Sequence, residues 1–508
     1  MRPGSLLWLV FPARLALLAG LAFLAGCPGG NGGLGDRCDD SSDCASTLQC
    51  VANTCGPRCL RAPDCGAGYS CTADGYCQVS TGQLGDSCTS ETDCVAGLSC
   101  ELGSDTDMTG ELVASCAPTS AGHPSGDTCV RDSDCHNNLC ALGRCVDLCD
   151  STLDCGTATS CAQIPRVEAY GALFGGCLQA QGSLAWNIPI DGPAQTVPLP
   201  IPDSAKSLAL TLTVDDPNQE VVVANLVAPD GTMLVDGAPF SDPVRFQPAL
   251  AQSVLAMPSS PSTPLEAGAY AMTVEALKPP YDPSNPLDFG TTPALTAVIK
   301  LDTSVILDLH FYFLNFDEFP CGTTAFGAAT FDATAAAASS FFQSEFLGSM
   351  RSVFASGGVA LGTLDYTDLR DHPDLDGLDI SNAGSLLALG ANAVGVNVFF
   401  VRSLSPAGLQ AYGPNPGPAG LANTAASGVI VALDTLCYRS WTDLARVAAH
   451  EISRYMGLYD NIELDEVHVD PIDDIDQSSA NLMFYSELGG TDLSPGQRAI
   501  LSRSVVLR

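Results

Sequence analysis

The sequence has few basic residues, and lysine is almost absent. Lysine occurs only at Lys206, Lys278 and Lys300, and 57 acidic residues outnumber the 21 lysines and arginines, which gives a formal net charge of −36 over 508 residues. A surface this acidic repels phosphate backbones, so nucleic acid is excluded as a natural partner. Cations and basic protein segments are the partners that this charge favours. The length of the chain indicates several domains.

An apolar run long enough to span a membrane is also missing. The N-terminal run, LALLAGLAFLAG, is short and is followed directly by Cys27, which predicts a secretion signal at residues 1–27. Leu24-Ala25-Gly26-Cys27 resembles the lipobox of bacterial lipoproteins, in which cleavage before the Cys leaves it acylated. This resemblance implies a lipid-anchored protein outside the cytoplasm, at the outer membrane or cell surface, with a flexible linker at 28–37. An ordinary signal peptide with an incidental Cys is the alternative.

CxxC pairs are absent, although the chain has 23 cysteines. Twenty of them lie between Cys38 and Cys177 in five units of four, and each unit has Asp immediately before its second Cys. Such short units cannot bury a sufficient core. Because the CxxC pairs of zinc knuckles are missing, we predict two disulfides per unit over 38–180 rather than bound zinc, with the pairing left open.

These units resemble the Cys-rich repeats of large secreted and lipid-anchored proteins of myxobacteria, which implies a stalk or a binding array. Besides Cys27, the chain has two more cysteines, Cys321 and Cys437. One lipidated Cys and 22 that pair leave no odd thiol, which indicates an oxidising compartment. Cys321 and Cys437 are predicted to form a disulfide within the last domain. A catalytic role is disfavoured because no His lies near either one in sequence.

Residues 182–300 contain no Cys and have a different pattern. Their apolar segments have strand length and are separated by turn signals such as PDGT, which predicts an all-β sandwich. The segments lie at 207–214, 220–227, 270–277 and 294–301. The pattern resembles the jelly-roll accessory domains of secreted bacterial proteases. Because no aromatic cluster suggests a sugar platform, a spacer without a ligand is favoured.

From residue 301 the pattern becomes α/β, and the fold class is multidomain: disulfide-rich repeats, a β-sandwich, then an α/β (α+β) domain. A long helix is predicted over 334–358, and a second helix begins at Ser440 as N-cap and ends at Gly457. Strands are predicted at 304–314, 359–369, 394–404 and 426–433. The last of these is predicted to be the edge strand that lies along a substrate.

The second helix carries HEISRYMGLYD, from His450 to Asp460. Residues four apart share a helix face, so His450 and Arg454 are expected to point into one cleft with Glu451 beside them. Gly457 allows a sharp turn that returns Asp460 to the same place. The stretch resembles HExxHxxGxxH, the zinc helix of the metzincin metalloproteases, in His450, Glu451 and Gly457. It departs from that motif at Arg454 and Asp460.

The resemblance extends over 301–508 and implies a zinc site with Glu451 as general base. Met483 resembles the Met-turn that lies beneath the metal, and Tyr485 stands where some members place a Tyr that approaches zinc. His468 is a replacement zinc ligand if its loop folds back; otherwise it is a surface residue.

Asp-Pro-Ile-Asp, residues 470–473, resembles the acidic loop of the pappalysin-like branch of this clan. There such carboxylates bind calcium, a hard cation that prefers oxygen ligands. Asp470 and Asp473 are therefore candidate calcium ligands, and a solvated acidic loop is the alternative.

The two departures from the motif differ in weight. Asp460 is acceptable because carboxylates bind zinc, whereas the guanidinium of Arg454 stays protonated and has no lone pair. We expect Arg454 to pair with Asp460 or Glu451 where the metal would lie. The sequence therefore predicts a metzincin-like domain that has lost normal zinc catalysis and binds a peptide or protein. Two alternatives remain: a divergent zinc endopeptidase using His450, Asp460 and one non-standard ligand, and a purely structural surface lipoprotein.

Overall fold

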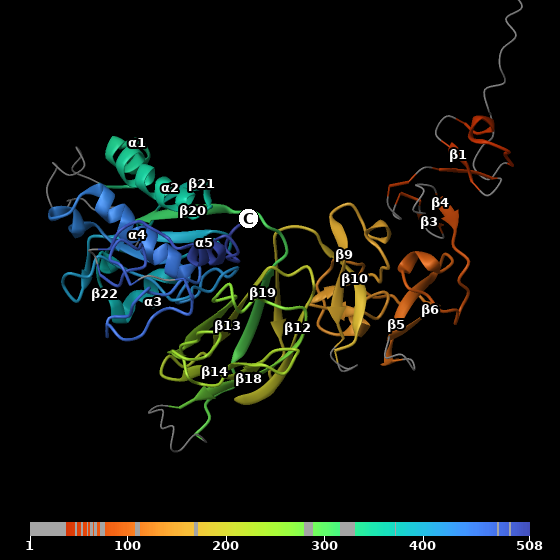
Figure 1. The fold of residues 1–508 in the computed structure, drawn as a ribbon, viewed down its shortest axis with the longest axis horizontal. Coiled ribbons are helices and arrows are strands. Elements are labelled where there is room, and N and C mark those ends of the chain that lie inside the picture. The colour runs from red at the N-terminus through yellow and green to blue at the C-terminus, as the bar shows by residue number, and fades with distance from the viewer. Residues whose placement is uncertain are drawn as a thin grey trace, which may run out of the picture.

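The structure is a computed structural model that describes most of the chain after residue 36. The described residues are 37–508, except 46–47, 52–53, 58, 61–63, 66–68, 72–76, 107–111, 167–170, 279–287, 315–330, 371, 475–476 and 487–488. The predicted signal segment, Cys27 and Cys321 therefore lie outside the described residues. Among the described residues, no helix has the length and apolar character needed to cross a membrane. Figure 1 shows the Cys-rich units at one end, antiparallel sheets in the middle and a mixed sheet with helices at the other end.

Each of the five Cys-rich units contains two disulfides, as predicted, and all five use the same pairing. The first Cys of a unit bonds to the third, and the second to the fourth. The bonds are Cys38–Cys50, Cys44–Cys55, Cys59–Cys71, Cys65–Cys77, Cys88–Cys100, Cys94–Cys116, Cys129–Cys140, Cys135–Cys145, Cys149–Cys161 and Cys155–Cys177. Ten disulfides indicate an oxidising environment.

The Asp before the second Cys closes a short helical turn in these units. In the third unit, for example, a carboxylate oxygen of Asp93 accepts hydrogen bonds from the amides of Thr89 and Ser90, at 2.8 and 3.0 Å, which satisfies donors that the turn leaves free. Such turns are η1 (Ser41–Asp43), η3 (Glu91–Asp93), η4 (Asp132–Asp134) and η5 (Thr152–Asp154).

A β-hairpin follows in each unit, and its two strands place the third and fourth Cys opposite each other, as in Cys50 and Cys55. The register therefore fixes both disulfides on one side of the hairpin. The hairpins pair β1 (Leu48–Val51) with β2 (Thr54–Pro57), β3 (Tyr69–Cys71) with β4 (Cys77–Val79), β5 (Leu98–Thr106) with β6 (Leu112–Pro118), β7 (Cys140–Ala141) with β8 (Arg144–Cys145), and β9 (Thr159–Pro165) with β10 (Leu173–Gln179).

Residues 183–300 form two antiparallel sheets. One sheet has the order β11 (Ser183–Ile188), β19 (Ala294–Lys300), β13 (Ser207–Thr213) and β17 (Gln252–Met257). The other has the order β12 (Ala194–Ile201), β18 (Gly268–Leu277), β14 (Glu220–Val227) and β15 (Met233–Val235), and β16 (Ala249–Leu250) pairs with β14. All four strands predicted from apolar patterning are present. Leu210 and Leu255 of the first sheet and Val223 and Val274 of the second are fully buried in one hydrophobic cluster.

The last part of the chain forms a five-stranded mixed sheet. Its order is β21 (Ala360–Asp368), β20 (Ile306–Phe313), β23 (Val396–Val401), β26 (Val429–Ala432) and β25 (Ala411–Tyr412). The first four strands are parallel, and β25 is antiparallel to β26. The prediction that 426–433 is the edge strand was wrong, because β25 lies outside it. A two-residue strand is too short to show an alternating pattern.

The helices cover this sheet, and α2 packs against α4. They are α1 (Ala333–Ala338), the π-helical turn η6 (Phe341–Phe346), α2 (Leu347–Ser356), α3 (Ala383–Leu387), α4 (Trp441–Tyr455) and α5 (Pro495–Leu501). Short helical turns are η7 (Pro373–Leu375), η8 (Ile380–Asn382) and η9 (Leu433–Cys437). A separate small sheet pairs β22 (Gly377–Asp379) with β24 (Ser403–Ser405). The predicted helix over 334–358 is broken at Ser339, whose ψ of 122° is extended. The Ser339 hydroxyl accepts the amide of Phe342 at 3.3 Å, a local bond that competes with the helix.

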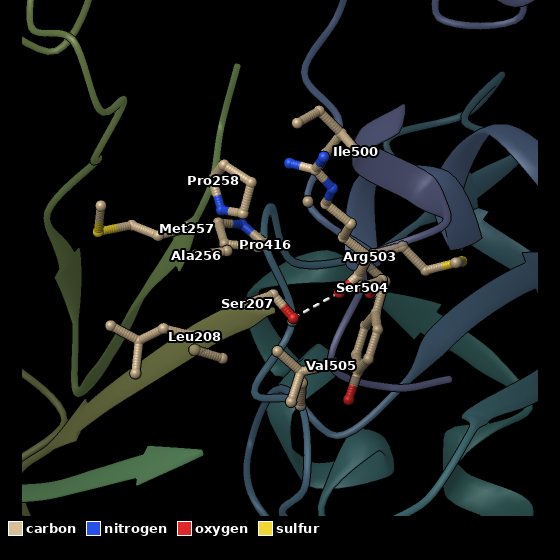
Figure 2. Close-up of a pocket in the computed structure, with 16 residues that line it drawn as sticks. Ser207, Leu208, Ala256, Met257, Pro258, Pro416, Ile500, Arg503, Ser504 and Val505 are labelled. Carbon is tan, nitrogen blue, oxygen red and sulfur yellow. Dashed lines mark hydrogen bonds between the residues drawn. The ribbon is translucent and has the colours of Figure 1, made fainter. Parts of the chain in front are cut away.

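The antiparallel sheets pack directly against the last part of the chain. Figure 2 shows Ser207 of β13 donating its hydroxyl hydrogen bond to the backbone of Arg503. The fully buried ammonium of Lys300 donates to the carbonyl of Leu507 at 2.8 Å. The cavity left between the two faces has a volume of about 20 Å³, room for about one water molecule. The two segments therefore form a closely packed interface.

Candidate functional site

Helix α4 positions the motif residues by burying almost all of one helix face. Ser440 is its N-cap. The Ser440 hydroxyl accepts a hydrogen bond from the amide of Asp443 at 3.1 Å, and the Asp443 carboxylate accepts one from the amide of Ser440 at 3.1 Å. This reciprocal pair satisfies two donors of the first turn. Trp441 packs edge-on against Phe342 and Phe346. The helix is thus fixed at its start, two turns before His450.

The end of α4 is a tight left-handed turn. The amide of Gly457 donates to the carbonyl of Arg454, and the amide of Leu458 donates to that of Ser453, both at 3.0 Å. This is the Schellman arrangement, which requires positive φ at the residue after the cap; φ of Gly457 is +108°. The reversal brings Asp460 back beside His450.

Four side chains meet at this point: His450, Glu451, Arg454 and Asp460. His450 Nε2 lies 3.4 Å from Asp460 Oδ1, and Arg454 Nη1 lies 3.5 Å from Glu451 Oε2. Arg454 Nε lies 3.9 Å from Asp460 Oδ1. Glu451 Oε2, Arg454 Nε and Asp460 Oδ1 are buried and have no hydrogen-bond partner. The cluster is therefore held by charge at distances longer than good hydrogen bonds.

The imidazole of His450 is oriented by a backbone carbonyl of the loop that carries Met483. Its Nδ1 lies 2.9 Å from the carbonyl oxygen of Leu482, and because a carbonyl only accepts, Nδ1 carries the proton. Nε2 therefore faces Asp460. Although burial alone raises the pKa of Asp460, its polar contact with His450 and the positive charge of Arg454 hold that pKa below its usual value. Asp460 is ionised at neutral pH.

The electrostatics of Arg454 also reflect its neighbours. Burial lowers the pKa of the guanidinium, but the carboxylates of Glu451 and Asp460 more than offset this and raise it. Arg454 therefore carries a permanent positive charge between two carboxylates.

These residues do not fit a zinc ion. Two ligands of a tetrahedral zinc, each at about 2.0–2.1 Å, are about 3.3 Å apart, and the distance from His450 Nε2 to Asp460 Oδ1 matches that separation. The third ligand position on the helix belongs to Arg454, which has no lone pair. A fixed cation at that position repels a metal ion. The Cys groups of the N-terminal units are disulfide-bonded and hold no metal either.

A cleft of about 140 Å³ opens beside the four-residue cluster. One wall is the stretch Gly408–Ala411, which leads into the edge strand β25. The opposite wall and rim are formed by Arg446, Val447, His450, Glu451, Tyr485 and Ser486. Of the four motif side chains, His450 and Glu451 thus face a space that a ligand can enter.

Met483 and Tyr485 lie in the loop beneath His450. Met483 is fully buried, and its carbonyl accepts the amide of Asn461 at 2.8 Å. Tyr485 lines the cleft, and its hydroxyl donates to Glu466 at 2.9 Å. This bond directs the phenol hydroxyl to the rim.

His468 contacts residues other than the four-residue cluster. Its Nδ1 pairs with Asp465 at 2.5 Å, and its ring stacks on Phe240 with centroids 4.0 Å apart. The side chain is 41% exposed. The loop thus folds onto the antiparallel sheets, where His468 has partners of its own.

The candidate calcium ligands occupy different surroundings. Asp470 is buried; burial raises its pKa to about 8, which favours the protonated form at neutral pH. Its Oδ1 accepts the amide of Ile472 at 2.9 Å, whereas Oδ2 is buried without a partner. Asp473 is exposed and lines a separate cavity with Ser260 and Ser262.

Cys437 ends η9, just before α4, and takes part in a disulfide. The partner predicted for it, Cys321, lies outside the described residues.

Arg245, from the antiparallel sheets, was not found by sequence reasoning. It is 2% exposed, forms an ion pair with Glu463, and lies 4.6 Å from the ring centroid of Phe240 and 4.5 Å from that of Tyr459. Its charge also lowers the pKa of Asp460. An isolated Arg gives no sequence signal for this contact, because Glu463 and Tyr459 lie more than 200 residues further along the chain.

Comparison with known proteins assigns no family, because neither a protein-family model nor a curated protein matches the chain. Fold and site together define a protein with an N-terminal disulfide-rich region and a mostly β body with several sheets and few helices.

Proposed function

We propose that this is an extracytoplasmic, lipid-anchored binding protein whose residues 301–508 form a metzincin-like domain without normal zinc catalysis. In this proposal, Cys27 carries the lipid, the Cys-rich units form the stalk, and residues 182–300 form a β-sandwich spacer. The cleft beside α4 binds a peptide or a protein segment.

The fold supports the metzincin-like part of this proposal. A parallel sheet with one short antiparallel edge strand faces the helix that carries HEISRYMGLYD. The loop with Met483 lies beneath His450, since Leu482 accepts the imidazole hydrogen bond. Each feature alone is common, and their combination at these positions supports the relationship.

The observation that carries the loss of catalysis is the position of Arg454. Its guanidinium lies 3.5 Å from Glu451 Oε2 and 3.9 Å from Asp460 Oδ1. Glu451 would have to take a proton from a metal-bound water in the active enzyme, but here it faces a guanidinium. The guanidinium thus lies beside the carboxylate that would have to face the metal-bound water.

Peptide binding is supported by the outer edge of the sheet. Within the part of the chain that the structure describes, β25 pairs with β26 on one side and with no strand on the other. Strand addition supplies affinity through main-chain hydrogen bonds. The cleft lies along this same stretch, at Gly408–Ala411.

The zinc content of the purified full chain tests the proposal. We expect metal analysis after dialysis against chelator-free buffer to show far less than one zinc per chain. Near-stoichiometric, tightly held zinc would refute the loss of the site.

Arg454→His adds the missing imidazole to a site whose first and last ligands already lie 3.4 Å apart. We expect this variant to bind about one zinc per chain, whereas Arg454→Gln, which only removes the charge, binds none. If Arg454→His gains no zinc, the cleft has been remodelled beyond the loss of one ligand.

The second candidate function is a divergent zinc endopeptidase, which the retained spacing between His450 and Asp460 favours. In that case Glu451→Ala abolishes proteolysis of a denatured protein substrate. Proteolysis that persists in Glu451→Ala would remove this candidate.

A further inference from the structure

The charged groups that line the cleft beside α4 limit the chemistry of its ligand. The inference below rests on the proposed binding function. Arg446 is the cationic residue of the lining, but its guanidinium donates to the carbonyls of Leu482, Phe484 and Ser486 at 3.0–3.4 Å. Its donors are thus directed at the chain itself. The guanidinium of Arg446 is therefore already hydrogen-bonded to the chain and does not favour an anionic ligand.

Glu451 provides an acceptor instead. Its side chain is 9% exposed and lines the cleft, and Oε2 has no hydrogen-bond partner. The nearest cation, Arg454 Nη1, lies at 3.5 Å. A buried carboxylate oxygen without a hydrogen bond is costly, so a ligand that donates to it gains free energy.

The backbone of the edge segment lies close to this buried oxygen, at the wall of the cleft. Residue 413, which follows β25, is Gly, and a Cβ there would lie 3.3 Å from Glu451 Oε2. Residue 413 therefore places no side chain against the carboxylate, and the neighbouring edge-strand residue Tyr412 is close enough to feel its charge. A strand added to β25 passes close to this carboxylate.

We infer that the cleft binds a basic group of an extended peptide, a Lys or Arg side chain or a free amino terminus, through the unpartnered carboxylate oxygen of Glu451. Charge-assisted hydrogen bonds to an ionised acceptor are stronger than neutral ones. The formal charge of −36 also attracts basic peptides from solution.

Randomised peptide libraries test this with the full chain. Hexapeptides with blocked ends and a fixed central residue, which is Lys, Arg, norleucine or Glu, are incubated with immobilised protein, and the bound fraction is quantified by mass spectrometry. A norleucine library with a free amino terminus is the fifth arm. We expect the Lys, Arg or free-amine arm to be retained about tenfold more than blocked norleucine.

Glu451→Gln keeps the shape and removes the charge, so it should abolish the preference. Glu345→Gln makes the same change on the exposed surface of η6 and should leave the preference intact. Gly413→Ala is not used, because its Cβ would lie 2.9 Å from the buried Val429 and disturb the sheet. An unchanged urea unfolding midpoint of Glu451→Gln guards against an effect of misfolding.

Equal retention of basic and norleucine libraries, or a preference that survives Glu451→Gln, overturns this inference and leaves the proposed binding function standing. Retention of no library above the Glu451→Gln protein also overturns it. Stoichiometric zinc in the same preparation overturns the proposed function itself, which separates the two failures.

Discussion

Single side chains determine the charge state of each part of this molecule. In the Cys-rich region, His136 lies between two carboxylates, with Nε2 3.8 Å from Glu91 and 3.6 Å from Asp147. Glu91 comes from the third unit, His136 from the fourth, and Asp147 from the segment between the fourth and fifth. The interaction between the units thus includes a charge set by protonation of one imidazole, whereas the motif site contains the permanent charge of Arg454.

This imidazole predicts a pH dependence. Glu91, with a smaller contribution from Asp147, raises the pKa of His136 to about 9 against the effect of burial. Because the folded pKa exceeds the unfolded value of about 6.5, the contact is fully stabilising below about pH 6.5 and is lost as pH rises to about 9. Since the imidazole is partly exposed, we expect a loss of roughly 1 kcal/mol after screening.

Hydrogen exchange at the amide of Cys100, which donates to Glu91 at 3.0 Å, measures this loss locally. Protection corrected for the intrinsic rate should fall between pH 6.5 and 9. His136→Gln should remove the dependence, and His123→Gln, at a 63% exposed imidazole, should retain it. Identical profiles for the two variants would contradict the assignment.

At the scale of elements, turns and caps decide where residues meet. The Schellman turn at the end of α4 closes over Gly457 and returns Asp460 to His450. The amide of Gly417 further donates to the carbonyl of Tyr455 at 3.0 Å, so the last turn of the helix is satisfied by a neighbouring loop. The position of the motif thus depends on backbone geometry as well as on side chains.

Gly457→Ala tests this turn. A Cβ there meets only Ala256, at 3.7 Å, but the residue has φ of +108°. We therefore expect a cost of about 1–2 kcal/mol from backbone strain alone, measured by urea unfolding with tryptophan fluorescence. Gly348→Ala, in the first turn of α2 where a Cβ meets no atom within 4 Å, is the matched control and should stabilise by about 0.5–1 kcal/mol. Similar effects of the two substitutions would contradict this account.

Patterns within one element were predictable from the sequence. Ser440 as the N-cap and the strands of residues 183–300 follow from local residue order, and two disulfides per unit follow from cysteine spacing. Features that depend on distant residues could not be predicted from the sequence. The two-residue edge strand β25 and the pairing of Arg245 with Glu463 each result from packing between segments, which local patterns do not report. The break at Ser339 is local, but the helical spacing of the apolar residues around it masked the competing hydroxyl bond.

At the scale of the whole molecule, the antiparallel sheets and the last part of the chain are joined through buried polar groups. Arg245 pairs with Glu463 and contacts the ring of Tyr459, whose hydroxyl donates to the Arg245 carbonyl at 2.9 Å. Lys300 and Ser207 add hydrogen bonds to the C-terminal backbone. The loop between Asp460 and Val469 is thus held from outside its own segment, which makes the sheets part of the support of the site.

Arg245→Met tests this joint role. Methionine fills much of the volume but leaves Glu463 without its cation, and breaking a buried ion pair costs about 3–5 kcal/mol. We expect the two segments to unfold in one urea transition in the natural chain and in two separate transitions in this variant. Lys278→Met breaks an exposed pair, Lys278 and Asp288 at 53% and 70% exposure, and should leave unfolding unchanged. Adding Glu463→Gln to Arg245→Met removes the unpaired charge and should bring the two transitions closer together. A single transition in Arg245→Met would show that the ion pair between Arg245 and Glu463 contributes little to joining the segments.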